Sequence, residues 1–262
     1  FRVFYRNWPG ERPVVVGGRP IEGWRAAGDG LYTAPTDPSW KFYQIFEDDR
    51  PGRLARHPNE GYFYVAAGVL ETDADGKPRK NRLGQTLYSP RQFHYFAGDL
   101  PREWRDLRGG QVHVWASYDW FTSRLPIETV DRDRRLVTLT RPALGSIYRR
   151  PERRYRFVGL KGALDAPGEF WRDPDTGDVF YRPMSDGPPT EHTIVAPTVA
   201  NVIRLEGEGP DRPVHHVVFD GIDVSVSSFT DTFVETSGTH GEGPWNEPMN
   251  KHGAVHFEHA DD

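Results

Sequence analysis

The chain has 262 residues, enough for one large all-β domain or two smaller ones. Its 27 glycines and 23 prolines interrupt the sequence too often for long helices, and the absence of cysteine excludes disulfides and thiolate metal sites. A formal net charge of -5 gives no electrostatic argument for binding nucleic acid or an anionic membrane.

Two short runs typical of β-strands open the chain, at Val3–Tyr5 and Val14–Val16. A turn cluster rich in proline and glycine separates them, and Gly17-Gly18 ends the second run. Because Phe1 already lies inside a strand-like run, we expect a leader and further mature sequence to precede it.

From Ile21 to about Glu191 the chain alternates between short aromatic or β-branched runs and turn residues. The runs are Leu31–Thr33, Phe42–Phe46, Tyr62–Val65, Val112–Trp115, Leu136–Leu139, Tyr155–Val158 and Val179–Tyr181. Many short strands at this spacing predict an antiparallel sandwich or barrel. One short helix is predicted near Pro101–Leu107.

The residue pattern changes from Thr193 onward. The runs Val202–Gly207, Val217–Val224 and Ala254–Asp262 are short, β-branched and separated by turns, as in the coils of a parallel β-helix. A single coil cannot bury its apolar face, so about three are needed for stability. This segment supplies about two, and we expect a further polypeptide segment to complete the β-helix.

Three stretches carry a family resemblance. They are residues 5–24 (YRNWPGERPVVVGGRPIEGW), residues 55–63 (ARHPNEGYF) with 120–127 (WFTSRLPI), and residues 163–171 (ALDAPGEFW) with Asp175-Thr176-Gly177 and 180–183 (FYRP). In these stretches the chain resembles bacterial right-handed parallel β-helix carbohydrate-active enzymes of glycoside hydrolase family 141, and more loosely family 120.

The resemblance implies an all-β fold in which a right-handed parallel β-helix is interrupted early by an inserted antiparallel β-sandwich or barrel-like domain. The first coil would span residues 1–20, the inserted domain 21–191 and the continuing coils 192–262. It further implies a secreted or periplasmic glycosidase that acts on plant or microbial glycans, as a fucosidase, xylanase or xylosidase. Its two catalytic carboxylates would be carried by later coils, beyond residue 262.

Ten residues are predicted to bind an oligo- or polysaccharide substrate. They are Arg56, Asn59, Tyr62, Trp120, Arg124, His240, Trp245, Asn246, Glu247 and His252. The last five lie in or beside a glycine-rich excursion, Ser227–Lys251, and loops of this kind commonly form one wall of a groove. Each candidate also has a structural interpretation: Arg56 and Asn59 can lock a turn, and an arginine beside a tryptophan can be a packing pair.

Glycoside hydrolysis needs two carboxyl groups. Asp220 and Asp223 are more simply explained as turn or solvent-facing residues. Glu235, Glu242 and Glu247 lie in the excursion, and a catalytic role is the less favoured interpretation of each. The histidines near the C-terminus give only a weak metal pattern, so no cofactor is predicted to be required, although a structural Ca²⁺ stays open. The basic run Arg149–Arg154 is interpreted as a solvated loop.

Two other functions stay open. A polysaccharide lyase would need a basic groove for uronic acids and often Ca²⁺, and parallel β-helices host lyases as well as hydrolases. A non-catalytic glycan-binding or adhesion protein would need aromatic platforms but no paired acids.

Overall fold

The computed structural model describes residues 1–116, 122–151, 153–228, 233–234 and 253–261. In this part of the chain the regular structure is β-strand, apart from the 3-10 turns η1 (Lys161–Ala163) and η2 (Pro189–Glu191). The predicted all-β class is therefore confirmed. The chain divides into two compact units, a first unit of residues 1–53, 176–230 and 250–262 and a second unit of residues 54–175 and 231–249. The predicted domain boundaries at residues 20 and 191 stay a prediction.

The helix predicted near Pro101–Leu107 is wrong, because this segment forms turns. Arg132 donates hydrogen bonds to the carbonyl oxygens of Pro101, at 3.1 Å, and Trp104. The Pro101 carbonyl also accepts from the Trp104 amide at 3.3 Å, which closes a single turn, and no helical residue follows up to Leu107. So short a segment also has too few internal hydrogen bonds to offset helix nucleation.

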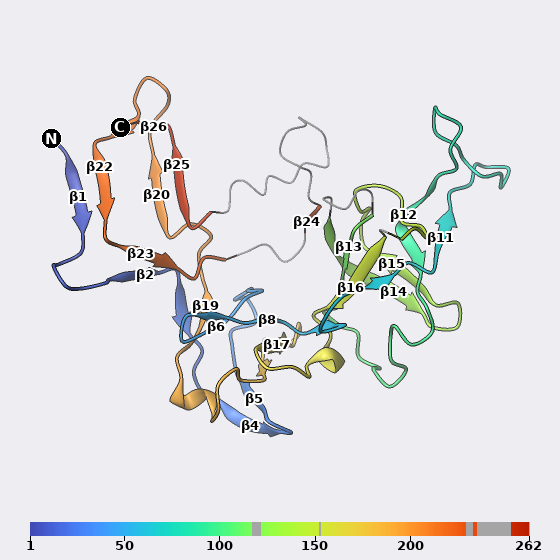
Figure 1. The fold of residues 1–262 in the computed structure, drawn as a ribbon, viewed down its shortest axis with the longest axis horizontal. Helices are drawn as coiled ribbons and strands as arrows, with labels where there is room; N and C mark the ends of the chain where they lie inside the picture. Colours follow the sequence, from blue (N-terminus) through green and yellow to red (C-terminus); the bar gives the residue numbers. More distant parts are fainter. Residues whose placement is uncertain (117–121, 152, 229–232, 235–252, 262) are drawn as a thin grey trace. The chain divides into compact units, whose positions relative to one another are not determined.

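Four strand pairs of the first unit are parallel (Figure 1). They are β1 (Val3–Arg6) with β22 (Val217–Asp220), β2 (Val14–Val16) with β23 (Asp223–Ser225), β20 (Ile203–Glu206) with β25 (Val255–Glu258), and β21 (Val214–His215) with β26 (Ala260–Asp261). Each pair forms a two-stranded sheet, whereas most of the other strand pairs are antiparallel. The structure thus shows parallel pairing at the predicted coils, but it does not show a parallel β-helix.

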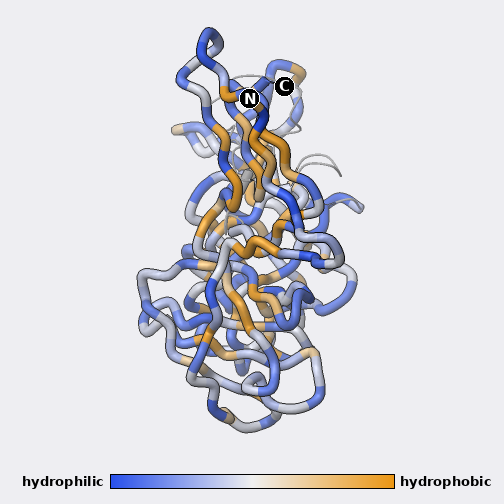
Figure 2. Tube along the Cα trace, turned by 90° about the vertical axis from the view of Figure 1, so that its left-hand side faces the viewer, coloured by the Kyte–Doolittle hydropathy of each residue, from blue (hydrophilic) through white to orange (hydrophobic). Residues whose placement is uncertain are grey.

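The parallel strands expose apolar side chains. Orange stretches in Figure 2 follow these strands near the two marked termini. Tyr5 is paired with Phe219, and their rings stack at 5.2 Å between centroids. Tyr5 is nevertheless 52% exposed, Val16 is 44% exposed and Phe257 is 56% exposed. Exposed apolar side chains on neighbouring strands are typical of surfaces that another element covers.

The first unit also contains antiparallel strands. They are β3 (Gly18–Pro20), β19 (Ile194–Pro197), β6 (Phe46–Glu47) and β7 (Arg50–Pro51), in that sheet order, and β4 (Arg25–Gly28), β5 (Leu31–Ala34) and β18 (Val179–Tyr181). Asp48 and Asp49 join β6 to β7 with positive φ values of 47° and 68°, as a two-residue hairpin turn of this twist requires. The strand predicted from Phe42 begins only at Phe46, although Phe42 itself is buried.

The second unit is built on one extended antiparallel sheet (Figure 1). Its path is β10 (Phe63–Tyr64), β16 (Arg154–Val158), β13 (Gln111–Val114), β14 (Ser123–Asp131), β15 (Leu136–Leu139), β12 (Tyr88–His94) and β11 (Ala67–Leu70), with β9 (Arg56–His57) beside β16 and β24 (Phe233–Val234) beside β14. β17 (Glu169–Arg172) also belongs to this unit, and β8 (Arg53–Leu54) lies at its start. The pairing register of β14 with β15 shifts between Ile127 and Thr129, and such a bulge bends and twists a strand.

The core of the second unit follows from strand alternation. Val112 and Val114 of β13, Leu125 of β14 and Tyr155 and Phe157 of β16 are fully buried, and each is separated from the next on its strand by one residue. Full burial of an aliphatic or aromatic side chain of this size contributes about 1.5–3 kcal/mol. The residues between them must therefore lie on the opposite face of the sheet.

Candidate functional site

That opposite face gathers arginines and aromatic rings from three adjacent strands. His113 lies between the buried Val112 and Val114, and Arg154 and Arg156 alternate with the core residues of β16. His113 is paired directly with Arg156. The antiparallel register thus places an imidazole and two guanidinium groups side by side.

Two of the predicted substrate-binding residues belong to the same face. Arg124 of β14 is paired with His113, and its Nε donates to Gln111 Oε1 at 2.6 Å. Tyr62 precedes β10, and its ring meets that of Trp115 edge-on at 4.9 Å. We call this group the arginine–aromatic face; its members are Tyr62, His113, Trp115, Arg124, Arg154 and Arg156.

The rings and cations of the arginine–aromatic face are interleaved. The Arg154 guanidinium lies 5.0 Å from the Tyr62 ring centroid and 4.8 Å from that of Trp115. Arg156 lies 4.3 Å from the Tyr62 ring, and His113 stacks on Trp115 at 4.3 Å. Cation–π contacts of this kind hold the arginines over the rings. The half-exposed side chains form a cationic surface with many N–H donors.

His113 is a neutral member of this surface. Burial, reinforced by the positive charges of Arg124, Arg156 and Arg154, lowers the pKa of His113 to about 3. The imidazole is therefore uncharged at physiological pH and is a poor general acid. The arrangement suits the binding of hydroxyl-rich or anionic ligands rather than proton transfer.

Arg56 and Asn59 form a different structure, a locked turn. Arg56 donates to the carbonyl oxygen of Asn59 at 2.6 Å, and Asn59 Nδ2 donates to Asp165 at 2.7 Å. The buried Glu169 carboxylate accepts bonds from the backbone amides of Asp165 and Ala166 at 3.3 and 3.2 Å. These contacts support the turn-locking interpretation, and the role of both residues in substrate binding stays a prediction.

Six further predicted residues lie outside the described part of the chain. They are Trp120, His240, Trp245, Asn246, Glu247 and His252. The same holds for most of the excursion Ser227–Lys251, so its predicted part in a substrate groove stays a prediction.

The first unit contains a buried carboxylate, Glu47, which the sequence did not single out. It accepts hydrogen bonds from Tyr181 Oη at 2.6 Å and from the amides of Met184 and Ser185 at 3.0 and 2.8 Å. Arg50 adds an ion pair at 2.8 Å. Burial alone would raise the pKa of Glu47, but the hydrogen bonds from Ser185, Tyr181 and Met184 outweigh it and lower the pKa. A fully satisfied, ionised carboxylate is an anchor for the loop after β18 rather than a catalytic acid.

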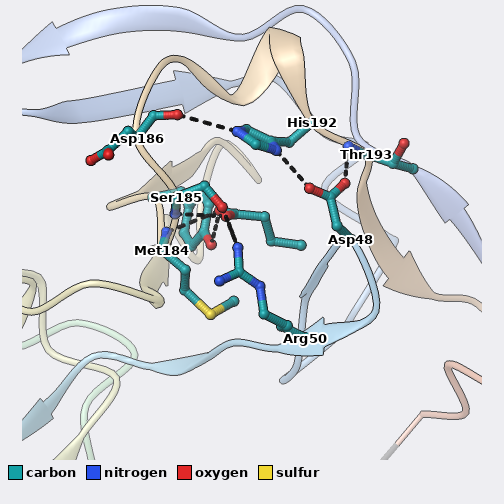
Figure 3. Close-up of polar contacts among 9 residues, drawn as sticks. Asp48, Arg50, Met184, Ser185, Asp186, His192 and Thr193 are labelled. Carbon is teal, nitrogen blue, oxygen red and sulfur yellow. Dashed lines mark hydrogen bonds and ion pairs between the residues drawn. The ribbon is translucent and has the colours of Figure 1, made fainter.

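An ion pair lies beside this anchor. His192 Nδ1 is 2.6 Å from Asp48 Oδ2, and Asp48 also accepts a bond from the amide of Thr193 at 2.8 Å (Figure 3). The hydrogen bonds that the His192 ring donates to the Asp48 carboxylate and to the Asp186 carbonyl raise the pKa of His192. This pair ties the β6–β7 turn to the segment before β19.

The acids of the parallel strands form surface ion pairs. Asp220 lies 3.4 Å from Arg6, Asp223 lies 2.5 Å from Arg12, and Glu258 lies 3.4 Å from His256. For Asp220 and Asp223 this agrees with their interpretation as structural residues. Within the described ranges no group of three His, Cys, Asp or Glu residues is arranged to hold a metal ion, so that part gives no support for a structural Ca²⁺. Nor does any helix in those ranges have the length and apolarity to cross a membrane.

Comparison with known proteins gives a fold relationship. No family model matches the chain, and no curated protein matches it. Among solved structures the fold is similar to that of a chain named "Glycoside hydrolase", with a TM-score of 0.65 and 18% sequence identity. The similarity covers 87% of this chain but only 39% of that chain. The chain thus has a glycoside-hydrolase-like fold and spans well under half the length of that neighbour.

Sequence reasoning missed part of the site. His113 was not a candidate, although its place one residue before Val114 and Trp115 in a strand-like run was a usable signal. The interpretation of Arg149–Arg154 as a solvated loop is correct for the exposed Arg149 and Arg150 but wrong for Arg153, which is 6% exposed. Because a charge run carries no periodic apolar signal, its burial could not be anticipated.

Proposed function

We propose that this chain is part of a glycan-acting hydrolase. The observation that carries the proposal is the fold similarity to a glycoside hydrolase over 87% of the chain. The arginine–aromatic face supports it independently, because stacked rings and N–H donors are suited to sugar rings and their hydroxyls.

In this proposal the four parallel strand pairs are coils of a right-handed parallel β-helix, as in the family 141 and family 120 enzymes that the sequence resembles. The exposed apolar residues along these strands, such as Val16 and Phe257, support a further polypeptide segment that packs on them and completes the helix. The protein would act outside the cytoplasm, secreted or periplasmic, where plant or microbial glycans are met.

The reaction proposed is hydrolysis with two carboxylates, one as general acid and one as nucleophile or base, and it needs no cofactor. Asp220, Asp223 and Glu258 lie in surface ion pairs, and Glu47 is sealed in its hydrogen-bond network. As the family resemblance implies, we propose that the catalytic carboxylates are carried by coils beyond residue 262. In this assignment the chain binds and orients the glycan.

The test uses the intact natural protein that carries this sequence. Aryl fucoside, xyloside, arabinoside and galactoside substrates, with a few plant glycans, are incubated and the released sugars are measured. Hydrolysis of one of them supports the proposal. Glycan binding without any bond cleavage would overturn it in favour of a non-catalytic glycan-binding protein.

A matched pair of variants tests the arginine–aromatic face. Tyr62→Ala removes a ring that contacts Trp115, Arg154 and Arg156, and we expect it to weaken glycan binding by about tenfold. Phe96→Ala, at a 44% exposed aromatic position after β12, is the control and should bind normally. Equal binding by both variants would exclude this face from substrate recognition.

A polysaccharide lyase is a second candidate, favoured by the guanidinium groups of Arg124, Arg154 and Arg156 on one face, because lyases of this shape act on uronic acids. Incubation with plant glycans that contain uronic acids separates the two reactions. A lyase leaves an unsaturated sugar with ultraviolet absorbance at the new non-reducing end, whereas a hydrolase leaves that end saturated.

A further inference from the structure

Arg153, in the second unit, is a buried arginine with an unusual environment. Its side chain is 6% exposed, and its Nε and Nη1 atoms have no hydrogen-bond acceptor among the described residues. The backbone fixes its position: the Arg153 amide donates to the Arg150 carbonyl at 3.1 Å, and its own carbonyl accepts from the Val65 amide at 3.0 Å. The guanidinium itself lies 5.4 Å from the Tyr148 ring centroid.

Such an arrangement is costly for the protein alone. An arginine stays protonated at any physiological pH, and its buried Nε and Nη1 groups lose hydration that the contact with the Tyr148 ring replaces only in part. The planar fork of N–H groups matches the two oxygens of a carboxylate or sulfate. A bound oxyanion would therefore supply Arg153 with hydrogen-bond acceptors and a counter-charge.

Arg153 lines a pocket of about 530 Å³, which lies within the size range of ligand sites. The other polar side chains on its wall are the Arg150 guanidinium and the amides or hydroxyls of Asn81, Gln85, Thr86, Tyr88, Ser146 and Tyr148. None of the residues that line it carries a carboxylate. The pocket thus offers positive charge at one place and neutral hydrogen-bonding groups around it.

An aromatic pair stiffens the wall behind the arginines. Tyr88 and Tyr148 stack at 4.9 Å with their planes 13° apart, and Arg150 lies 5.1 Å from the Tyr148 ring. A side chain at Gly68 would come within 2.7 Å of Tyr148 Cβ and of the Tyr88 ring, so only glycine lets the pair pack against β11. The cationic groups are consequently held in place before any ligand arrives.

We propose that this pocket binds an acidic sugar residue of the glycan, with its carboxylate or sulfate on Arg153 and its hydroxyls on the neutral side chains. The oxyanion follows from Arg153 and the pocket, whereas the assignment of that oxyanion to a sugar rests on the proposed function. The pocket is separate from the arginine–aromatic face, whose arginines contact Tyr62 and Trp115 instead.

The test is calorimetric titration of the intact protein with digalacturonate, with the corresponding neutral disaccharide, and with inorganic sulfate. Digalacturonate should bind, and the neutral disaccharide should bind at least about tenfold more weakly, since a charge-assisted pair is lost. Sulfate as tight as digalacturonate would overturn the sugar part of the proposal. No binding of either anion would overturn it altogether.

Variants on one loop supply the control. Arg153→Met should lower the affinity for digalacturonate at least about tenfold, whereas Arg149→Met, at an exposed position outside the pocket wall, should leave it unchanged. Arg153→Lys keeps the positive charge but lacks the planar guanidinium, so its affinity for digalacturonate should lie between those of the two methionine variants. If the Arg153→Met variant folds and binds digalacturonate with wild-type affinity, the proposed site is refuted. If this variant does not fold, wild-type affinity of the Arg153→Lys variant refutes the site instead.

The outcome is distinguishable from that of the proposed function, because binding is measured without cleavage. Hydrolysis of neutral glycosides without any binding of acidic sugars would refute the proposal for the pocket and leave the proposed function standing. Without ligand, Arg153→Met should melt at the same temperature as the wild type or higher, because it removes a buried charge that is only partly compensated. A lower melting temperature would mean that Arg153 serves the fold rather than a ligand.

Discussion

Replacement of Glu47 by glutamine changes one oxygen of a fully buried carboxylate into an NH₂ group. One carboxylate oxygen accepts from Tyr181 Oη and the Met184 amide, and the other accepts from the Ser185 amide and Arg50. Glutamine has a single acceptor oxygen, so one of these two pairs of donors loses its acceptor and faces the NH₂ group of the glutamine side chain instead. The arrangement that preserves the Tyr181 side is favoured because Arg50 is 51% exposed and can turn to water.

The expected cost follows from the bonds lost. One buried amide left without an acceptor costs about 1–3 kcal/mol, and a half-exposed ion pair adds less than about 1 kcal/mol after solvent screening. We therefore expect Glu47→Gln to destabilise the protein by about 2–3 kcal/mol. For a chain of this size this corresponds to a fall in melting temperature of about 4–10 °C.

Two measurements test this, thermal unfolding and hydrogen exchange at the Met184 and Ser185 amides. Arg50→Ala is the matched control and should cost less than about 1 kcal/mol. The pKa of Glu47 lies below its ordinary value of 4.5, so its contribution is present above pH 4.5 and is lost as the pH falls through the folded pKa. The difference between wild type and Glu47→Gln should therefore shrink on acidification. A cost under about 0.5 kcal/mol, or a difference that grows in acid, would refute the reasoning.

Three further predictions concern titratable groups. The His192 imidazole should titrate above 6.5 in an NMR pH titration, because Asp48 and the Asp186 carbonyl accept hydrogen bonds from its charged form. Its contribution to stability should be present below pH 6.5 and lost as the pH rises through the raised pKa. A titration midpoint at the ordinary value would contradict this prediction. His113, whose pKa is about 3, should instead show constant ring signals from about pH 8 to about pH 5. Tyr155→Phe should cost about 1–3 kcal/mol in denaturant unfolding, because the buried Asp99 carboxyl loses a hydroxyl donor at 2.7 Å. A loss under about 0.5 kcal/mol would show that water replaces the hydroxyl.

Local patterns predicted the strands well where β-branched, aliphatic or aromatic residues form a short continuous run. Val14–Val16, Leu136–Leu139 and Val179–Tyr181 are strands with these bounds. The prediction failed at Phe42, a fully buried aromatic residue that lies outside any strand. An apolar run reports burial, whereas a strand also needs a partner edge, and that partner is set by residues far away in the sequence.

The candidate site was predicted only in part, again because strand partners are set by residues far apart in the sequence. Tyr62 and Arg124 were chosen as residue types suited to sugars, and the register of β10, β16, β13 and β14 brings them to one face. Which arginines join them depends on pairing across strands, such as that of His113 with Arg156. No spacing within a single run shows which residue of another strand lies beside His113, so its pairing with Arg156 was not anticipated.

The run Arg149–Arg154 shows why a charge run is hard to interpret from sequence. β16 begins at Arg154, so the run crosses from a loop into a strand and its members meet different surroundings. Arg153 packs on Tyr148 in the polar pocket, whereas its neighbour Arg154 lies over Tyr62 and Trp115. Adjacent residues thus supply the two candidate binding surfaces of the second unit. Because the surfaces share no ring, loss of Arg153 should affect acidic-sugar binding and leave the arginine–aromatic face intact, and loss of Arg154 should do the reverse.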